Sequence, residues 1–291
     1  MEQKKSWLIK IRQALYTNSS FFYLSLTANQ RLKPKKRLRF ETDVAGHCNL
    51  NCKSCTHFSP LADPYFVKKE IFEKDFARLS QLAGRNNENI DIMGGEPLLH
   101  PEISALAEIA RKYFDGPINI VTNGLLLEKM NEVFWESCGK NNIHIIVTSY
   151  PVKLNVKQIK ELAKKYSVAL KIRTRLMNKH AWCRLPFDLN GGQNITENRK
   201  FCLTVNKCIF LKEGRLATCC LPLVADRFNN YFGKVMEATD GDSIDIYKAK
   251  DMGEIYEFLS KPMQFCRYCR IKSWEIGIEW GVSKKDISEW V

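Results

Sequence analysis

Residues 39–175 alternate between strand-like and helical segments, and few folds accept that order. Apolar runs such as "NIDIM" (89–93) and "IHIIVTSY" (143–150) have the length and β-branched content of strands. Segments 68–83 and 155–166 instead repeat apolar residues at helical spacing. Strands separated by helices pair in parallel through right-handed crossovers. The sequence therefore predicts an α/β fold with five parallel strands and four helices, either open or curled into a barrel.

Polar motifs follow four of the predicted strands. They are the cysteine-containing loop 47–58, "GGEP" (94–97), "TNG" (122–124) and "TSY" (148–150). The carboxyl ends of parallel strands lie at one edge of a sheet, where the loops of α/β proteins carry binding and catalytic groups. We therefore expect these four motifs to meet in one site.

Eleven cysteines are present, and most of them fall into two groups. The first group is the C-x3-C-x2-C array of Cys48, Cys52 and Cys55, and the second lies in the last third of the chain. Clusters at short spacing in a reducing compartment favour metal binding over disulfides. Zinc would need a fourth ligand beside the first array, such as His47 or His57, whereas a [4Fe–4S] cubane on three thiolates keeps one iron open.

The array directly after the first strand, with "GGEP" after the second, resembles the radical S-adenosylmethionine (radical SAM) superfamily over roughly residues 38–175. This resemblance implies a partial (β/α)6 TIM-like barrel and a [4Fe–4S] cluster on Cys48, Cys52 and Cys55, whose open iron binds S-adenosylmethionine. It also implies an enzyme that cleaves this cofactor reductively and uses the 5′-deoxyadenosyl radical to remove a substrate hydrogen atom. An external reductant such as flavodoxin or ferredoxin is the expected partner.

The "GGEP" motif is expected at the methionine end of S-adenosylmethionine. Glycines let a backbone approach a ligand closely, so the motif would shape the edge that receives the ammonium group. The same four letters also suit an ordinary strand-to-helix turn. The residues concerned are Gly94, Gly95, Glu96 and Pro97.

The resemblance assigns further residues to the cofactor. Asn123 and Ser149 end the third and fourth strands, where the family places ribose and carboxylate contacts. Arg173, in the fifth strand, would neutralise the carboxylate. The family often has an aromatic residue where this chain has Ser54, so Phe58 is expected to pack against the adenine instead.

The last third of the chain resembles the auxiliary-cluster Twitch appendage, the shorter relative of the SPASM domain. A hairpin turning at Glu213-Gly214 would bring cysteines together, and a C-terminal C-x2-C would close the site. One auxiliary [4Fe–4S] cluster is expected, with zinc as the alternative metal. The expected ligands are Cys202, Cys219, Cys266 and Cys269, with Cys208 as the next candidate and Cys220 as a packing residue.

These patterns divide the chain into four parts. We expect a basic N-terminal extension (1–38), a radical SAM core (39–175), a polar loop on the substrate side (176–200) and a Twitch-like domain (201–291).

The net charge of +13 is concentrated at the N-terminus, where residues 1–39 hold ten Lys/Arg against one Glu. A nucleic-acid surface would spread basic residues through the fold, so no nucleic-acid partner is expected. The segment suits a peripheral contact with a membrane or an anionic glycolipid, or a helix docked on the body. Without an apolar run of spanning length or a signal peptide, the expected location is cytoplasmic, at the inner membrane surface if such contact occurs.

The expected reaction is oxidation. A fully ligated second cluster can accept an electron from a substrate radical, as in the family's alcohol dehydrogenases, and Arg173 and Tyr150 are candidates to assist deprotonation. The last third is also similar to radical SAM proteins that accompany surface-polysaccharide genes. We therefore expect dehydrogenation of a carbohydrate or nucleotide-sugar alcohol, lipid-linked substrates included.

Three alternatives stay open. One is a sugar epimerase in which Cys183 returns a hydrogen atom to the opposite face of the substrate. Another is a peptide-maturing enzyme. The third, from a different class, is a non-catalytic zinc-binding module, which would be colourless and would have no need for Glu96.

Overall fold

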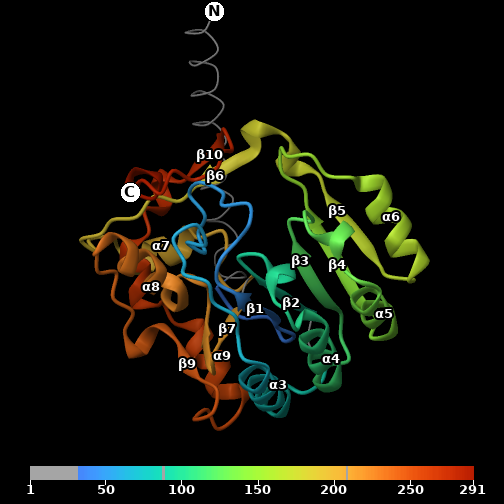
Figure 1. The fold of residues 1–291 in the computed structure, drawn as a ribbon. Coiled ribbons are helices and arrows are strands. Elements are labelled where there is room, and N and C mark those ends of the chain that lie inside the picture. Colours follow the sequence, from blue (N-terminus) through green and yellow to red (C-terminus); the bar gives the residue numbers. More distant parts are fainter. Residues whose placement is uncertain (1–31, 87–88, 208) are drawn as a thin grey trace, which may run out of the picture.

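The computed structural model describes residues 32–86, 89–207 and 209–291. Within these residues the main sheet has eight strands in the order β5-β4-β3-β2-β1-β7-β8-β9 (Figure 1). The strands from β5 to β7 pair in parallel, and β8 and β9 are antiparallel to their neighbours. The predicted α/β fold with a mostly parallel sheet is confirmed.

The strands of this sheet are β1 (Arg39–Ala45), β2 (Asn89–Gly94), β3 (Ile118–Thr122), β4 (Ile143–Thr148), β5 (Leu170–Arg173), β7 (Ile209–Lys212), β8 (Arg215–Ala217) and β9 (Ile244–Asp245). The helices are α3 (Lys69–Ala83), α4 (Ile103–Tyr113), α5 (Glu132–Lys140), α6 (Val156–Lys165), α7 (Ile195–Phe201), α8 (Leu221–Phe232) and α9 (Met252–Ser260). A separate antiparallel pair joins β6 (Trp182–Arg184) to β10 (Glu275–Ile278). Helices α3 to α6 each connect two successive parallel strands, so the predicted alternation is present.

A sixth parallel strand lies at an unexpected edge of the sheet. Strand β7 pairs with β1, with Phe40 opposite Ile209, so it lies beside the first strand and not beyond β5. The segment 176–200 that follows β5 is too polar and rich in Gly and Asn for a buried parallel strand. The hairpin of the last third therefore continues the core sheet, and no boundary at residue 201 divides the two in the sheet.

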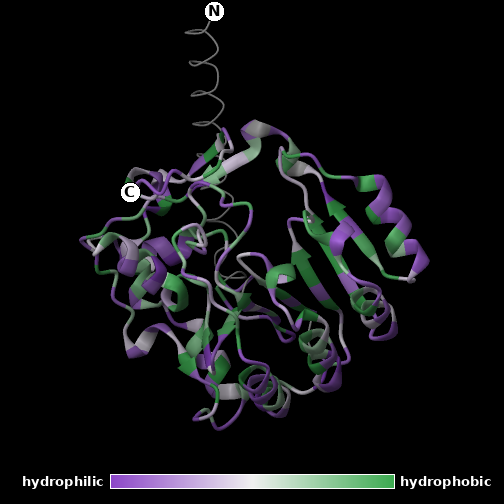
Figure 2. Cartoon of the chain, in the orientation of Figure 1, coloured by the Kyte–Doolittle hydropathy of each residue, from purple (hydrophilic) through white to green (hydrophobic). Residues whose placement is uncertain are grey.

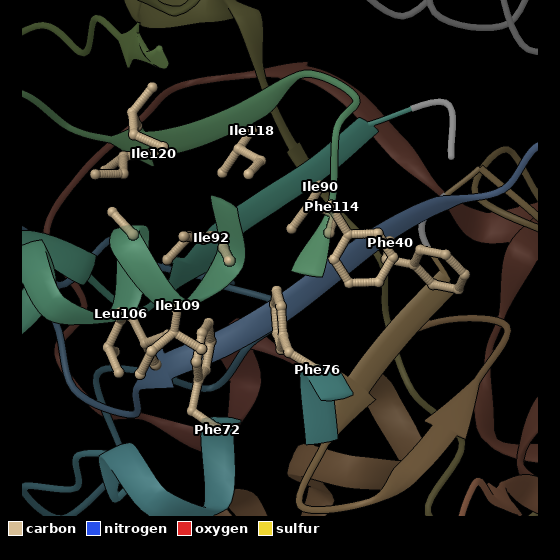
Figure 3. Packing of buried hydrophobic residues seen from close by; sticks show 14 of the residues in the cluster. Phe40, Phe72, Phe76, Ile90, Ile92, Leu106, Ile109, Phe114, Ile118 and Ile120 are labelled. Atoms are coloured by element: carbon tan, nitrogen blue, oxygen red, sulfur yellow. The ribbon is translucent and has the colours of Figure 1, made fainter. Parts of the chain in front are cut away.

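The main hydrophobic core fills the space between the sheet and its helices. Figure 3 shows Phe72 and Phe76 of α3 packed toward Ile90 and Ile92 of β2, with Phe114 beside them. All five are at most 2% exposed. Figure 2 shows the strands as mainly hydrophobic and the outer side of α6 as hydrophilic, the pattern expected of helices that cover a buried sheet.

A second core joins the cysteine loop to the last third of the chain. Phe58 packs against Phe187, Phe228 and Trp290, with ring centroids 5.3 to 6.3 Å apart. These aromatic side chains are fully buried. The loop of the first cysteine array is thus fixed from both sides, by the main sheet and by this second core.

The predicted basic extension (1–38) lies mostly outside the described residues, and so does the proposed membrane contact through it. In the part of the chain that the structure describes, no helix combines the length and the apolar character needed to cross a bilayer.

The predicted hairpin turn is confirmed. Glu213 and Gly214 both have positive φ, 47° and 74°, as a two-residue turn between β7 and β8 requires. Asp75 of α3 accepts a hydrogen bond from the Gly214 amide at 2.9 Å. The ring of Tyr247 lies over the glycine, where a Cβ atom would come 2.4 Å from its Cε2 atom.

Replacing Gly214 with alanine should lower the free energy of unfolding more than replacing Gly233. Both glycines have positive φ, so each variant adds strain on the order of 1–2 kcal/mol. No atom lies within 4 Å of a Cβ built at Gly233, whereas the Tyr247 ring would have to move at Gly214. We expect about 1–3 kcal/mol more for Gly214→Ala in urea unfolding, and equal losses would contradict this packing.

Candidate active site

The end of β2 lies unusually close to the chain that follows β1. The Gly95 amide donates to Ala45 O at 2.6 Å, and the Glu96 amide donates to His47 O at 3.0 Å. A Cβ on Gly95 would lie 2.1 Å from His47 O, and one on Gly94 would lie 2.4 Å from Ala45 O. Both glycines are therefore required by this contact between strands, a reason that the sequence analysis did not identify.

This contact places the cysteine loop and the β2 end around one cavity of about 290 Å³. Its wall includes residues from the ends of β1 to β5 and from β6, which lie far apart in the sequence. The predicted site residues in the wall are Cys48, Cys52, Cys55, Gly94, Gly95, Glu96, Asn123, Tyr150, Arg173 and Cys183.

Glu96 is 1% exposed and braces the loops around the cavity. One of its carboxylate oxygens accepts from Thr122 Oγ1 at 2.6 Å and from the Leu98 amide at 3.1 Å, and the other accepts from the Asn123 amide at 2.9 Å. Burial raises the pKa of Glu96 from 4.5 to about 7, although these bonds oppose the rise. Glu96 thus ties the end of β3 to the start of the 3-10 helix Pro97–Leu99.

Asn123 is directed at the cysteine loop. Its Nδ2 donates to Asn49 Oδ1 at 2.7 Å and lies 3.9 Å from Cys48 Sγ, while its Oδ1 accepts from the Leu125 amide at 2.9 Å. These contacts join the end of β3 to the first cysteine. Whether Asn123 also meets a ribose is a prediction that no contact here tests.

Three residues predicted to contact the cofactor lie outside the cavity wall. Phe58 is 0% exposed in the second core between Phe187 and Trp290, so its ring cannot reach an adenine without unpacking that core. Ser149 is 3% exposed and Pro97 is buried at the first position of its 3-10 helix. These placements correct the expected roles of all three: they are packing residues behind the site.

The chain's C-terminal segment closes over the cysteine loop. The Lys53 amide donates to Gly281 O at 2.9 Å, and the Ser283 amide donates to Asn51 O at 2.7 Å. Trp274, which sequence reasoning missed, also lines the cavity. Four of the six tryptophans lie at positions 182, 274, 280 and 290, a clustering that could have drawn attention to them.

The first cysteine array fits a metal cluster. Burial raises the pKa of Cys48 to about 11 and of Cys52 to about 12, so the protein alone does not stabilise their thiolates, which a bound metal would. Donors nevertheless face the sulfurs: the Leu50 amide is 3.4 Å from Cys48 Sγ, and Trp280 Nε1 is 3.2 Å from Cys52 Sγ. Among the described residues no three His, Cys, Asp or Glu side chains are arranged to hold a single ion. A cubane differs in taking each thiolate on a separate iron.

Residues 43–174 match the family model of the radical SAM superfamily. This segment is a radical SAM domain. It contains the cysteine loop, the glycine contact and the ends of β2 to β5 described above. No curated protein matches the sequence.

Solved structures similar to this chain are distant. BtrN in complex with AdoMet and 2-DOIA has 15% identity and a TM-score of 0.49, covering 81% of this chain and 94% of that chain. AnSMEcpe with bound AdoMet and Cp18Cys peptide has 21% identity and a TM-score of 0.37, covering 47% and 42%. SuiB of Streptococcus suis bound to S-adenosylmethionine has 17% identity and a TM-score of 0.39, covering 47% and 33%. The matched part thus spans less than half of the anSMEcpe and SuiB chains, and none of these likenesses assigns a substrate.

The second cysteine group surrounds a smaller cavity, of about 40 Å³, beside the radical SAM domain. All four expected ligands line it: Cys202, Cys219, Cys266 and Cys269. Cys220 is not in its wall, and Cys208 lies outside the described residues. The sequence therefore selected four residues that the tertiary structure brings together, although they come from three separate segments.

Arg199 is a buried cation at this second group, and sequence reasoning missed it. The side chain is 4% exposed and lines the same cavity, with its guanidinium donating to the carbonyls of Leu259 at 2.5 Å and Leu32 at 3.3 Å. Burial lowers the pKa of Arg199, and the nearby thiols of Cys266 and Cys202 oppose that change. A buried guanidinium is favourable beside anions, so its position suits cysteines that act as thiolates.

One side chain separates the two cavities. Leu185 follows β6 and contributes to the walls of both the 290 Å³ and the 40 Å³ cavity. The two cysteine groups therefore serve adjacent chambers, which neither spacing in the sequence nor the family match required.

Replacing Gly95 with alanine should disrupt the radical SAM site. The added Cβ would overlap His47 O, so the backbone must shift, and we expect a loss of about 1–3 kcal/mol in unfolding free energy with reduced iron loading at the first array. Gly241→Ala is the matched control, because its Cβ meets only Thr239 Oγ1 at 3.7 Å. Urea unfolding and iron analysis measure both effects, and a variant with the stability and iron of the wild type would refute the close contact.

Glu96 should make the stability of the metal-free protein depend on pH. Because its pKa is raised in the folded state, the folded chain binds this proton more tightly, and stability falls as pH rises from about 4.5 through about 7. At about 1.4 kcal/mol for each pKa unit, the contribution is about 3 kcal/mol. Glu96→Gln cannot titrate, so its unfolding free energy should decline less over this range. Parallel curves for the two proteins would show that Glu96 is not the group responsible.

Proposed function

We propose that this chain is a radical SAM dehydrogenase that oxidises an alcohol carbon of a carbohydrate or nucleotide-sugar-type substrate. A [4Fe–4S] cluster bound at Cys48, Cys52 and Cys55 would supply the electron that splits S-adenosylmethionine into methionine and a 5′-deoxyadenosyl radical. That radical removes the hydrogen atom from the alcohol carbon and becomes 5′-deoxyadenosine. The substrate radical then loses one proton and one electron to give the carbonyl product, with the electron passing to an auxiliary [4Fe–4S] cluster.

The observation that carries the proposal is the pair of adjacent cysteine-lined cavities. The larger one holds the cysteine array with Gly95 and Glu96, and only the smaller one is surrounded by four cysteines. Leu185 belongs to both walls, so a substrate in the larger cavity would lie close to an electron acceptor in the smaller one. The buried Arg199 supports an acceptor of negative charge there, as a cluster with four thiolates would be.

The substrate side of the larger cavity suits a sugar. Tyr150, Trp182 and Trp274 contribute aromatic walls, with the Tyr150 and Trp182 ring centroids 5.9 Å apart. Aromatic faces pack against the C–H faces of sugar rings, and Arg173 in the same wall can bond to hydroxyl or phosphate oxygens. Burial raises the pKa of Tyr150 well above 10, so its phenol donates a hydrogen bond and is no proton acceptor. Of the predicted catalytic residues, Arg173 is then the better candidate to assist the loss of the hydroxyl proton.

Epimerisation is the second candidate, because Cys183 lines the same cavity. A thiol there could return a hydrogen atom to the substrate radical from the face opposite the nucleoside. The product would be an inverted alcohol, and no electron would pass to the second cluster. A peptide substrate would be open to the same two reactions.

The proposed partners follow from charge and redox balance. One electron enters for each cofactor cleaved, so we propose flavodoxin or ferredoxin as the reductant. The basic residues 1–39, with a charge of +9, would favour an anionic or lipid-linked substrate and a peripheral membrane contact.

Anaerobic reconstitution tests the proposed chemistry. We expect brown protein that absorbs broadly near ~400 nm, holds about eight irons and forms 5′-deoxyadenosine under reductant. Replacing Cys48, Cys52 and Cys55 with alanine should leave about four irons and abolish cleavage. Replacing Cys266 and Cys269 should also leave about four, with cleavage retained and substrate oxidation lost. Bound zinc with no cofactor cleavage would instead establish the zinc-binding module.

Isotope labelling separates the two reactions on a panel of nucleotide sugars, lipid-linked saccharides and peptides. Oxidation gives a carbonyl product and no deuterium from D2O at the reacting carbon. Epimerisation gives an inverted product that carries deuterium, and Cys183→Ala should abolish it. Carbonyl formation that survives in Cys183→Ala supports the dehydrogenase.

A further inference from the structure

Three tryptophans from the last 110 residues donate their indole N–H groups to one short stretch of the cysteine loop. Trp182 Nε1 donates to Lys53 O at 2.9 Å, and Trp290 Nε1 donates to Cys55 O at 2.9 Å. Trp280 differs from both, because its Nε1 donates to the sulfur of Cys52 at 3.2 Å. Two indoles thus hold the loop through its backbone, and one contacts a cysteine of the array directly.

The position of Trp280 is fixed by its neighbours. Just beyond it, the Gly281 carbonyl accepts from the Lys53 amide at 2.9 Å, and Val282 forms a β-bridge with Cys52. On the other side, the Tyr150 ring lies 6.2 Å from the Trp280 ring between centroids. The backbone of the C-terminal segment therefore determines where the indole meets the sulfur.

The contact bears on redox chemistry. Hydrogen bonds to the sulfurs are among the factors that set the reduction potential of an iron–sulfur cluster. A donor stabilises the more negative, reduced state more than the oxidised state, so it raises the potential. The Trp280 contact is also shorter than the 3.9 Å between Asn123 Nδ2 and Cys48 Sγ.

We propose that Trp280 is a positioning residue that raises the reduction potential of the cluster held by Cys48, Cys52 and Cys55 through its N–H···S bond to Cys52. This inference rests on the proposed function, since it assumes that the array holds a [4Fe–4S] cluster. The C-terminal segment then takes part in radical generation, although it lies far outside residues 43–174 that match the family.

The test compares Trp280→Phe with Trp290→Phe in the full-length protein reconstituted anaerobically. Both variants remove an indole N–H from the same loop and keep an aromatic ring, but only Trp280 donates to sulfur. An EPR-monitored redox titration should show a more negative midpoint potential for Trp280→Phe at unchanged iron content, and a potential close to that of the wild type for Trp290→Phe. Formation of 5′-deoxyadenosine by Trp280→Phe should fall with a weak reductant and recover with a stronger one.

A second measurement does not depend on how the variants fold. Wild-type protein labelled with 15N in its indole rings should show hyperfine coupling between the reduced cluster and an indole nitrogen. Absence of that coupling, or a Trp280→Phe protein with full iron and an unchanged potential, overturns the role of Trp280. A wild type that binds no cluster at the first array and cleaves no cofactor overturns the proposed function as well, so the two failures are distinguishable.

Discussion

The close contact between the end of β2 and the chain after β1 determines much of this molecule. Gly95 and Glu96 donate amide bonds to the carbonyls of Ala45 and His47, which any side chain at position 95 would obstruct. The contact holds the cysteine loop over the carboxyl edge of the sheet and places Glu96 beneath it. Glu96 then links this edge to the end of β3. A parallel sheet supplies the edge, but two glycines allow its loops to form one cavity.

The last third of the chain completes the site in two ways. Its hairpin extends the core sheet through the pairing of β7 with β1, so the second cysteine group is attached to the radical SAM domain by main-chain hydrogen bonds. Its aromatic residues build a second core around Phe58, and its final segment pairs with the cysteine loop. The radical SAM domain and the last third therefore share one sheet and one loop, which explains how two cysteine-lined cavities come to share Leu185.

Buried charge marks both cavities. Glu96 is almost inaccessible, and it is tolerated because three donors satisfy its carboxylate. Arg199 is equally buried and is bonded to two backbone carbonyls, with thiols around it. Charges in such positions are costly for a fold alone. Their presence beside the cysteines is understandable if each cavity holds a charged group in the working enzyme.

The sequence by itself determined the α/β alternation, the hairpin at Glu213-Gly214 and the cysteines and strand ends that form the site. These follow from local pattern, because apolar period, turn residues and cysteine spacing are properties of neighbouring residues. The tertiary structure alone decided that β7 pairs with β1, that Phe58 packs in a core and not beside the cavity, and that Arg199 and Trp280 lie against cysteines. Each of these depends on contacts between segments more than a hundred residues apart or on how a second core packs. Such contacts are selected by the packing of the whole chain and leave no periodic signal in the sequence.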